Sequence, residues 1–235
     1  MMLLQSVQEA ATQGSATGTA MDWLWLVPML PLLGFVLNGA ISLLSATTLG
    51  PADPSAAGHG HRDDGHTAHG HDHEHPEPHK LAWLTSIIGS GVLIASFGVA
   101  VAVFMAYRSS GAADTAPIVQ TYFTWMLTGD LSIDASLMID QLSLVMVLVV
   151  TGVGALIHVF SVGYMREDPG YPRYFAYLNL FVFFMLVLVL GANYPVLFVG
   201  WEGVGLCSYL LIGFWFSDKD NADAGKKAFI VNRIG

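Results

Sequence analysis

Charged residues are scarce in this chain. They make up 11% of its 235 residues, whereas hydrophobic residues make up 54%. Because a soluble domain carries roughly 25% charged residues, the composition excludes an ordinary water-soluble domain. Basic residues are scarcer than acidic ones, since the sequence has nine Lys and Arg but 18 Asp and Glu. The chain therefore lacks the basic surface that binds a nucleic-acid backbone, and we expect no nucleic-acid partner.

Cysteine is nearly absent, since Cys207 is the only one in the sequence. A single thiol excludes a disulfide framework, a cysteine-rich zinc site and an iron–sulfur cluster held by this chain alone. No glycine-rich phosphate-binding loop follows a strand-like run either. We therefore expect no cofactor on this chain, and any redox chemistry it serves must take place on another chain.

Long apolar runs are what the chain has instead. Three charge-free runs reach or exceed the ~20 residues needed to cross a bilayer, namely Trp23–Thr47, Leu81–Tyr107 and Gln141–Met165. A fourth run, Tyr174–Ser217, has one charge in 44 residues and is too long for one span. A turn-like segment at Gly191–Pro195 divides it into two predicted helices, 174–190 and 195–216.

These runs predict an all-α polytopic membrane protein with five complete transmembrane helices and the start of a sixth. The lipid bilayer is therefore an expected partner. The expected organisation is an external tail (1–22), a first transmembrane helix (23–48), a His-rich cytoplasmic loop (49–80), a second transmembrane helix (81–107), an external loop with a β-hairpin (108–139), and transmembrane helices three to five with the start of the sixth (140–235).

Basic residues predict the orientation, because cytoplasmic loops retain Lys and Arg. Eight of the nine basic residues lie in or beside the odd-numbered connections, and Arg108 alone lies on the other side. This asymmetry places the amino terminus outside, which is the periplasm for a bacterial inner membrane. Residues 1–20 lack the features of a cleavable signal, and Met21 is a plausible alternative start.

The loop after the first span is of low complexity. It holds eight of the nine histidines, and His69, His71, His73 and His75 alternate with other residues. Such spacing makes these four residues weak candidates for loose zinc, nickel or copper binding. The alternative is a solvated, variable insertion with incidental metal affinity.

Deleting residues 59–79 is expected to leave membrane insertion unchanged. The segment is polar and lies outside every predicted span, so it contributes no apolar length to insertion. Protease protection of the flanking loops, compared between the deleted and unaltered chains, measures this. A misinserted product would show that the segment has a topogenic role.

The loop after the second span has a strand–turn–strand pattern. Strand-like residues at Tyr122–Trp125 precede a turn at Thr128–Asp130, and Leu131–Asp134 follow. This pattern predicts a short external β-hairpin.

Glu202 is the one formal charge deep within the 44-residue apolar run. An acid at such a depth costs on the order of 3 kcal/mol by insertion scales, so it faces protein or water and has a purpose. Helical periodicity places Gly205 and Tyr209 on the same face. The residues favour a proton-carrying or charge-paired role, and the alternative is a protonated acid that bonds between helices.

Three further polar residues lie in or beside the predicted spans. His158 lies about five residues before the cytoplasmic end of the third span, where it is a possible proton relay or a satisfied buried histidine. Asp140 begins the same span, where a carboxylate favours the helix amino terminus. Arg233 enters the sixth span with no acid nearby in the sequence, so we expect its partner on another helix or beyond residue 235.

The sequence also resembles a known family. The resemblance is strongest in two segments, WEGVGLCSYLLIGFWF (201–216) and AFIVNRIG (228–235). Four further segments support it, namely LVPMLPLLGF (26–35), IDQLSL (139–144), TGVGALIHVFSVGYM (151–165) and YPRYFAYLNLF (171–181). They resemble the large antiporter-like membrane subunit, subunit L or chain 5, of NADH-quinone oxidoreductase, respiratory complex I. The resemblance implies an antiporter-like helix bundle, of which this chain would be an amino-terminal fragment.

The function implied by this resemblance is proton translocation coupled to NADH oxidation and quinone reduction on other subunits. NAD, FMN, iron–sulfur clusters and quinone would be bound by partner subunits of the complex. In that family the residue that matches Glu202 takes part in proton transfer with a lysine on a later helix. Arg233 corresponds to a charged position involved in charge coupling. Because no lysine lies inside the spans of this chain, we expect Glu202 to be neutral here. An ionised Glu202 would mean that a partner within the chain replaces the lysine, with Arg233 as the first candidate.

Two other functions remain open from the sequence. One is the large subunit of a multisubunit cation/proton antiporter, which shares this fold and a similar glutamate motif. The other is a noncatalytic membrane scaffold.

Overall fold

The computed structural model describes residues 21–49, 81–109, 117–129 and 131–234. Its elements, in chain order, are η1 (Met21–Trp23), α2 (Leu26–Leu49), α3 (Ala82–Ser109), β1 (Ile118–Thr128), β2 (Leu131–Ile139), α4 (Gln141–Tyr164), α5 (Tyr171–Leu190), α6 (Tyr194–Ile212) and α7 (Lys219–Ile234). The candidate metal ligands His69, His71, His73 and His75, and the tail 1–20, lie outside the described residues.

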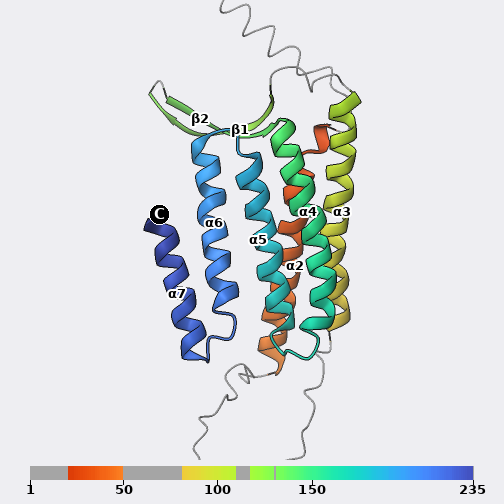
Figure 1. The fold of residues 1–235 in the computed structure, drawn as a ribbon, viewed down its shortest axis with the longest axis vertical. Helices are drawn as coiled ribbons and strands as arrows, with labels where there is room; N and C mark the ends of the chain where they lie inside the picture. Colours follow the sequence, from red (N-terminus) through yellow and green to blue (C-terminus); the bar gives the residue numbers. More distant parts are fainter. Residues whose placement is uncertain (1–20, 50–80, 110–116, 130, 235) are drawn as a thin grey trace, which may run out of the picture.

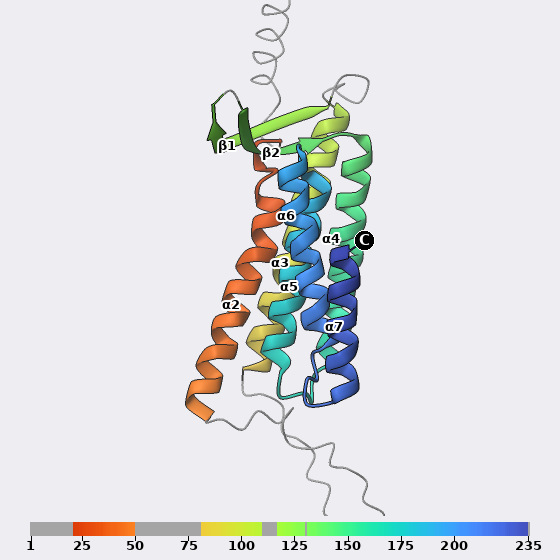
Figure 2. The same cartoon turned by 90° about the vertical axis from the view of Figure 1, so that its left-hand side faces the viewer.

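Five helices are long and apolar enough to cross a membrane, namely α2 to α6. They run side by side, and the β-hairpin lies across one end of the bundle (Figure 1). We call this end the hairpin end, and we call the opposite end, where short turns join α4 to α5 and α6 to α7, the turn end. Seen from the side, α2 and α7 lie at opposite edges (Figure 2). The predicted class, a helical membrane protein with a small hairpin, is confirmed.

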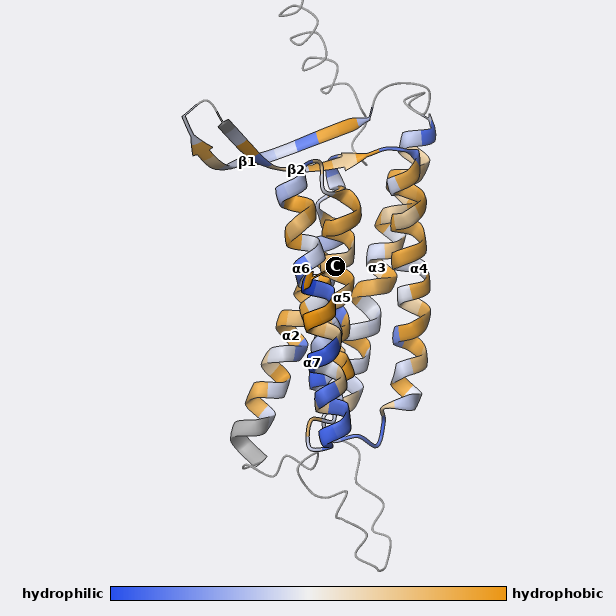
Figure 3. Cartoon of the chain, turned by 60° about the vertical axis from the view of Figure 1, so that its left-hand side comes forward, coloured by the Kyte–Doolittle hydropathy of each residue, from blue (hydrophilic) through white to orange (hydrophobic). Residues whose placement is uncertain are grey.

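Hydropathy separates the first five long helices from the last. Helices α2 to α6 are apolar along most of their length, whereas α7 begins with polar residues (Figure 3). The helix bounds differ from the predicted spans by a few residues. Helix α5 begins at Tyr171 instead of Tyr174, because Pro172 is suited to a first helical turn. Helix α6 ends at Ile212 instead of Phe216, and Gly213 caps it.

The hairpin is joined to the bundle through the turn between α5 and α6. The Asn193 Nδ2 donates a hydrogen bond to the Asp134 carbonyl at 2.7 Å, and the Ala192 N–H donates to the Ser136 carbonyl at 3.2 Å. Asn193 also caps α6 by accepting from the Val196 N–H at 3.0 Å. One asparagine therefore begins α6 and holds the hairpin over its first turn.

Asp140 begins α4 through a capping box. Its side chain accepts from the Ser143 N–H at 2.6 Å, and its own N–H donates to the Ser143 hydroxyl at 2.8 Å. Both bonds use backbone groups that a helix leaves unsatisfied at its start. The structural role predicted for Asp140 is confirmed.

A proline inside α2 leaves one carbonyl without its helical partner. Pro31 has no N–H to donate to the Val27 carbonyl. The Ser96 hydroxyl of α3 donates to that carbonyl instead, at 2.7 Å. The hydrocarbon of a bilayer contains no water that could bond to such a carbonyl. The Ser96 bond therefore satisfies the carbonyl and also links α2 to α3.

Glycines allow α5 and α6 to pack closely. A Cβ placed on Gly200 would lie 2.5 Å from the Leu188 backbone nitrogen and 2.6 Å from the Leu188 Cα. A Cβ on Gly203 would overlap the Phe184 ring. These two glycines therefore set the distance between α5 and the helix that carries Glu202.

Gly200→Ala is expected to lower the free energy of unfolding by about 1–3 kcal/mol, because the methyl group meets backbone atoms that cannot rotate away. Thermal or detergent denaturation of the purified chain measures this change. Gly98→Ala on α3 is the matched control, since no atom lies within 4 Å of its Cβ position. Equal unfolding midpoints for both variants would contradict the close approach of α5 and α6.

Candidate functional site

Glu202 forms an ion pair with Arg233. Its Oε2 lies 2.8 Å from the Arg233 Nη2, and the two side chains are 23% and 49% exposed, respectively. Glu202 lies in α6, eight residues after Tyr194, which corresponds to about 12 Å along the helix axis. The acid and its cation therefore meet away from both ends of α6, beside the carboxyl-terminal part of α7.

Helix α7 brings Arg233 to Glu202 by running back along α6. A Cβ on Gly205 would lie 2.5 Å from the Asn232 Nδ2, so the Asn232 side chain of α7 packs directly against Gly205. One helical turn further along, the Tyr209 and Phe229 rings pack with their centroids 5.6 Å apart. The α6 face predicted from helical spacing to carry Glu202, Gly205 and Tyr209 is the face that α7 covers.

The Phe229 ring also contacts the cation of the pair. The Arg233 guanidinium carbon lies 4.7 Å from the Phe229 ring centroid. A cation over an aromatic face gains about 0.5–2 kcal/mol depending on solvent exposure. Phe229 therefore limits how far the guanidinium moves and keeps it near the carboxylate.

The ion pair bears on two expectations. Of the two places where a partner for Arg233 was expected, the structure shows another helix, and the partner is Glu202. The expectation of a neutral Glu202 rested on the absence of a lysine inside the spans. Arg233, 31 residues further along the chain, was the first candidate for another counter-charge, and it lies 2.8 Å from the carboxylate.

His158 does not lie beside the ion pair. It is fully buried in α4, where its Nδ1 is 2.8 Å from the Gly154 carbonyl oxygen. The Phe175 ring of α5 lies edge-on, with the centroids 6.0 Å apart. Helix α5 contacts both α4 and α6 and lies between them (Figure 1). The structure therefore places His158 and the Glu202–Arg233 pair on opposite sides of α5.

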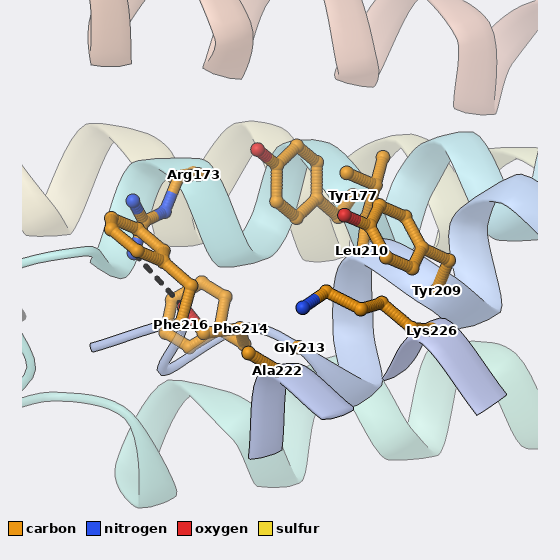
Figure 4. A pocket seen from close by; sticks show the side chains of 9 residues that line it. All are labelled: Arg173, Tyr177, Tyr209, Leu210, Gly213, Phe214, Phe216, Ala222 and Lys226. Atoms are coloured by element: carbon orange, nitrogen blue, oxygen red, sulfur yellow. Dashed lines mark hydrogen bonds between the residues drawn. The ribbon is translucent and has the colours of Figure 1, made fainter. Parts of the chain in front are cut away.

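A pocket of about 200 Å³ lies at the turn end, between α5, α6 and α7 (Figure 4). The sequence had not indicated it. Its lining residues are Arg173, Tyr177, Tyr209, Leu210, Gly213, Phe214, Phe216, Ala222 and Lys226.

Arg173 anchors the turn between α6 and α7 beside this pocket. Its Nη2 donates to the Phe214 carbonyl at 3.4 Å, and its guanidinium lies 4.7 Å from the Phe214 ring centroid. On the same turn, the Trp215 Nε1 donates to Asp168 at 2.9 Å. These contacts fix the turn against the start of α5, and they thereby set where α7 begins its return to Glu202.

Two asparagines were also missed in the sequence. Asn38 of α2 and Asn179 of α5 are both fully buried. Each is an amide inside an otherwise apolar run, which was the available signal, because polar residues within spans are rarely without a role.

The fold and the ion pair together define a class, a polytopic membrane protein that holds a paired acid between its helices. Comparison with known sequences shows what the chain is similar to. The sequence family described as NADH-ubiquinone oxidoreductase (complex I), chain 5 N-terminus, matches residues 125–175. The family described as NADH:quinone oxidoreductase/Mrp antiporter, TM, matches residues 192–235.

Individual relatives agree with this result. NADH-quinone oxidoreductase subunit L of Mycobacterium tuberculosis is 50% identical over 149 residues, which are 63% of this chain and 23% of the relative. The Escherichia coli subunit L is 55% identical over 116 residues, 49% of this chain and 19% of the relative. NADH-ubiquinone oxidoreductase chain 5 of Metridium senile is 54% identical over 99 residues, 42% of this chain and 16% of the relative.

The chain is thus similar to the antiporter-like subunit L and chain 5 proteins of NADH-quinone oxidoreductase, as the resemblance predicted. The matched part spans about a quarter or less of the length of these relatives.

Proposed function

We propose that this chain is part of a proton-translocating membrane subunit of an NADH-quinone oxidoreductase in a bacterial plasma membrane. The observation that carries the proposal is the Glu202–Arg233 pair, in which an acid inside the apolar helix α6 contacts a cation of α7. The similarity to subunit L and chain 5 proteins supports the same function. NADH oxidation and quinone reduction, with NAD, FMN and the iron–sulfur clusters, belong to partner subunits in this proposal.

The charge of Glu202 can be compensated either by Arg233 or by a bound proton. While the guanidinium lies 2.8 Å from the carboxylate, it favours the ionised form of Glu202. If Arg233 moves away, an isolated carboxylate in an apolar environment is costly, and Glu202 takes up a proton. Return of Arg233 expels that proton. Any motion of α7 along α6 is therefore coupled to proton uptake and release at one carboxyl group.

The orientation is part of the proposal. The positive-inside pattern places the turn end, with Arg173 and Lys226, in the cytoplasm and the hairpin end in the periplasm. Arg166, Arg173, Lys219, Lys226 and Lys227 lie at or near the turn end, whereas Arg108 lies at the hairpin end of α3 and Arg233 lies beside Glu202. His158 lies nearer to the turn end, where it would exchange protons with the cytoplasmic side.

A second candidate is a cation/proton antiporter subunit, because the family that matches residues 192–235 includes Mrp antiporters in its description. Inverted membrane vesicles that contain the complete subunit distinguish the two. NADH-driven acidification of the vesicle interior that depends on the subunit supports the proposal. Acidification or alkalinisation that follows an imposed sodium or potassium gradient without NADH would support the antiporter.

A further inference from the structure

His158 is a fully buried titratable side chain that takes no part in the Glu202–Arg233 pair. Its Nδ1 lies 2.8 Å from the Gly154 carbonyl oxygen, one helical turn earlier in α4. A carbonyl oxygen only accepts hydrogen bonds, so the Nδ1 carries the hydrogen of this bond. The neutral ring has one N–H, and the Gly154 carbonyl already uses it.

Two residues of α5 contact the same ring. The Phe175 ring lies edge-on to the imidazole, with the centroids 6.0 Å apart. Asn179 follows one turn later on the same face of α5, is fully buried, and is a hydrogen-bond partner of the His158 side chain. The ring is therefore held between the backbone of its own helix and an amide of the neighbouring one.

The orientation of the Asn179 amide is fixed by a second bond. Its Nδ2 donates to the Phe175 carbonyl at 2.9 Å. If the amide were turned over, its oxygen would face that carbonyl, and two acceptors would meet. The oxygen Oδ1 is therefore the atom that Asn179 offers to His158. Both ring nitrogens face acceptors, and a neutral imidazole can donate to only one of them.

We propose that His158 binds the translocated proton at Nε2 and that Asn179 is its positioning residue, whose Oδ1 accepts the N–H formed there. This proposal rests on the proposed function. Proton uptake forms the Nε2–H bond and converts the neutral imidazole into an imidazolium, whose second N–H donates to the Gly154 carbonyl. Loss of the Nε2 proton restores the neutral ring.

The surroundings of His158 make the bound proton easy to release. Helices α3 and α5 and strand β2 pack against α4. No acid lies within α3, α4 or α5 as described, and β2, which carries Asp134, lies at the hairpin end (Figure 1). Two dipolar acceptors stabilise a buried cation less than a carboxylate does. The other titratable side chains of the three helices are Tyr107, Arg108, Tyr164, Tyr171, Arg173, Tyr174 and Tyr177.

The position of His158 favours exchange with the turn end. It lies six residues before Tyr164, the last residue of α4, which corresponds to about 9 Å along the helix axis. The Ser161 hydroxyl lies one turn nearer to that end, 3.3 Å from the Tyr174 hydroxyl. Polar groups therefore lie between His158 and the turn end.

Solid-state NMR of the complete subunit, with isotope-labelled histidine and asparagine, tests the proposal without NADH. The His158 signals are obtained as the difference from a His158→Gln variant. As the pH is lowered, we expect a ring protonated at Nδ1 alone to become protonated at both nitrogens, with the new Nε2–H in contact with the Asn179 side chain. A ring that never carries both protons, or an Nε2–H without that contact, would overturn the proposal.

Two substitutions of Asn179 are expected to act in opposite directions. Asn179→Leu removes the acceptor and should lower the proton-binding constant of His158 about 10–100-fold, the equivalent of one hydrogen bond to a charged group. Asn179→Asp retains the side-chain shape and places a carboxylate at the acceptor, so the constant should rise. A residue that only fills space between the helices would not give changes of opposite sign. The Asp variant also remains informative if Asn179→Leu fails to fold.

Thr151→Val is the matched control. Its hydroxyl is also buried in α4, but it already donates to the Val147 carbonyl at 2.7 Å. We expect an unchanged proton-binding constant. A fall as large as that in Asn179→Leu would reflect a general disturbance of the bundle and would remove the case for Asn179.

Translocation is measured separately, as NADH-driven acidification per electron in inverted vesicles. Asn179→Leu should acidify less than Thr151→Val. Normal acidification in Asn179→Leu, together with the expected spectra, would place His158 outside the proton path; this inference would then fail while the proposed function stands. If the unaltered subunit contributes no NADH-driven acidification, the proposed function itself fails, whatever the spectra show.

Discussion

Glu202→Gln in the complete subunit is expected to assemble into the membrane but to lose proton translocation through this subunit. Glutamine preserves the shape and the hydrogen-bonding capacity of glutamate, so the packing of α6 against α7 should survive. It cannot bind and release a proton at neutral pH. Since a positioned acid or base typically contributes about 10²–10⁴-fold to a proton-transfer rate, the remaining flux should be close to background.

The measurement is NADH-driven acidification per electron transferred, in inverted vesicles with equal amounts of assembled protein. Glu167→Gln is the matched control, because Glu167 is an exposed acid in the connection between α4 and α5. We expect normal acidification in the control. Undiminished acidification in Glu202→Gln would exclude this carboxyl group from the proton path.

Arg233→Ala is expected to convert Glu202 from an ionised to a protonated carboxyl group at neutral pH. The substitution removes the guanidinium that lies 2.8 Å from the carboxylate. An uncompensated charge within the apolar part of a bilayer costs on the order of 3 kcal/mol, which protonation avoids. Protonation would leave Glu202 unable to accept a further proton, so translocation should fall together with the loss of the carboxylate.

Difference infrared spectroscopy checks this prediction. A protonated carboxyl band should be present in Arg233→Ala and absent in the double variant Arg233→Ala/Glu202→Gln. Arg233→Lys is the control that retains a positive charge, and the carboxylate should remain ionised in it. A carboxylate that stays ionised in Arg233→Ala would mean that another cation of the complete subunit compensates Glu202.

The sequence alone determined the membrane-spanning helices of this protein. Apolar run length is compared directly with the thickness of a bilayer, so the five spans could be predicted to within a few residues. Local signals also predicted the hairpin and the structural role of Asp140 at the beginning of α4. Such features depend on neighbouring residues and do not require knowledge of the rest of the fold.

Helical spacing likewise indicated the functional face of α6. The 3.6-residue repeat places Gly205 and Tyr209 on the face of Glu202 whatever surrounds the helix. The depth of Glu202 within its apolar run marked it as a candidate site. The same information did not establish the partner of Glu202. It named Arg233 only as the first candidate if the carboxyl group were ionised.

Only the tertiary structure decided which charged and polar groups meet. Arg233 reaches Glu202 because the turn held by Arg173 and Trp215 directs α7 back along α6. His158 is separated from that pair by α5, and instead it joins Asn179 from a neighbouring helix. Periodicity fixes the face on which a residue lies, but the helix that covers that face depends on turn geometry and on where glycines allow close packing, and both are properties of the assembled bundle.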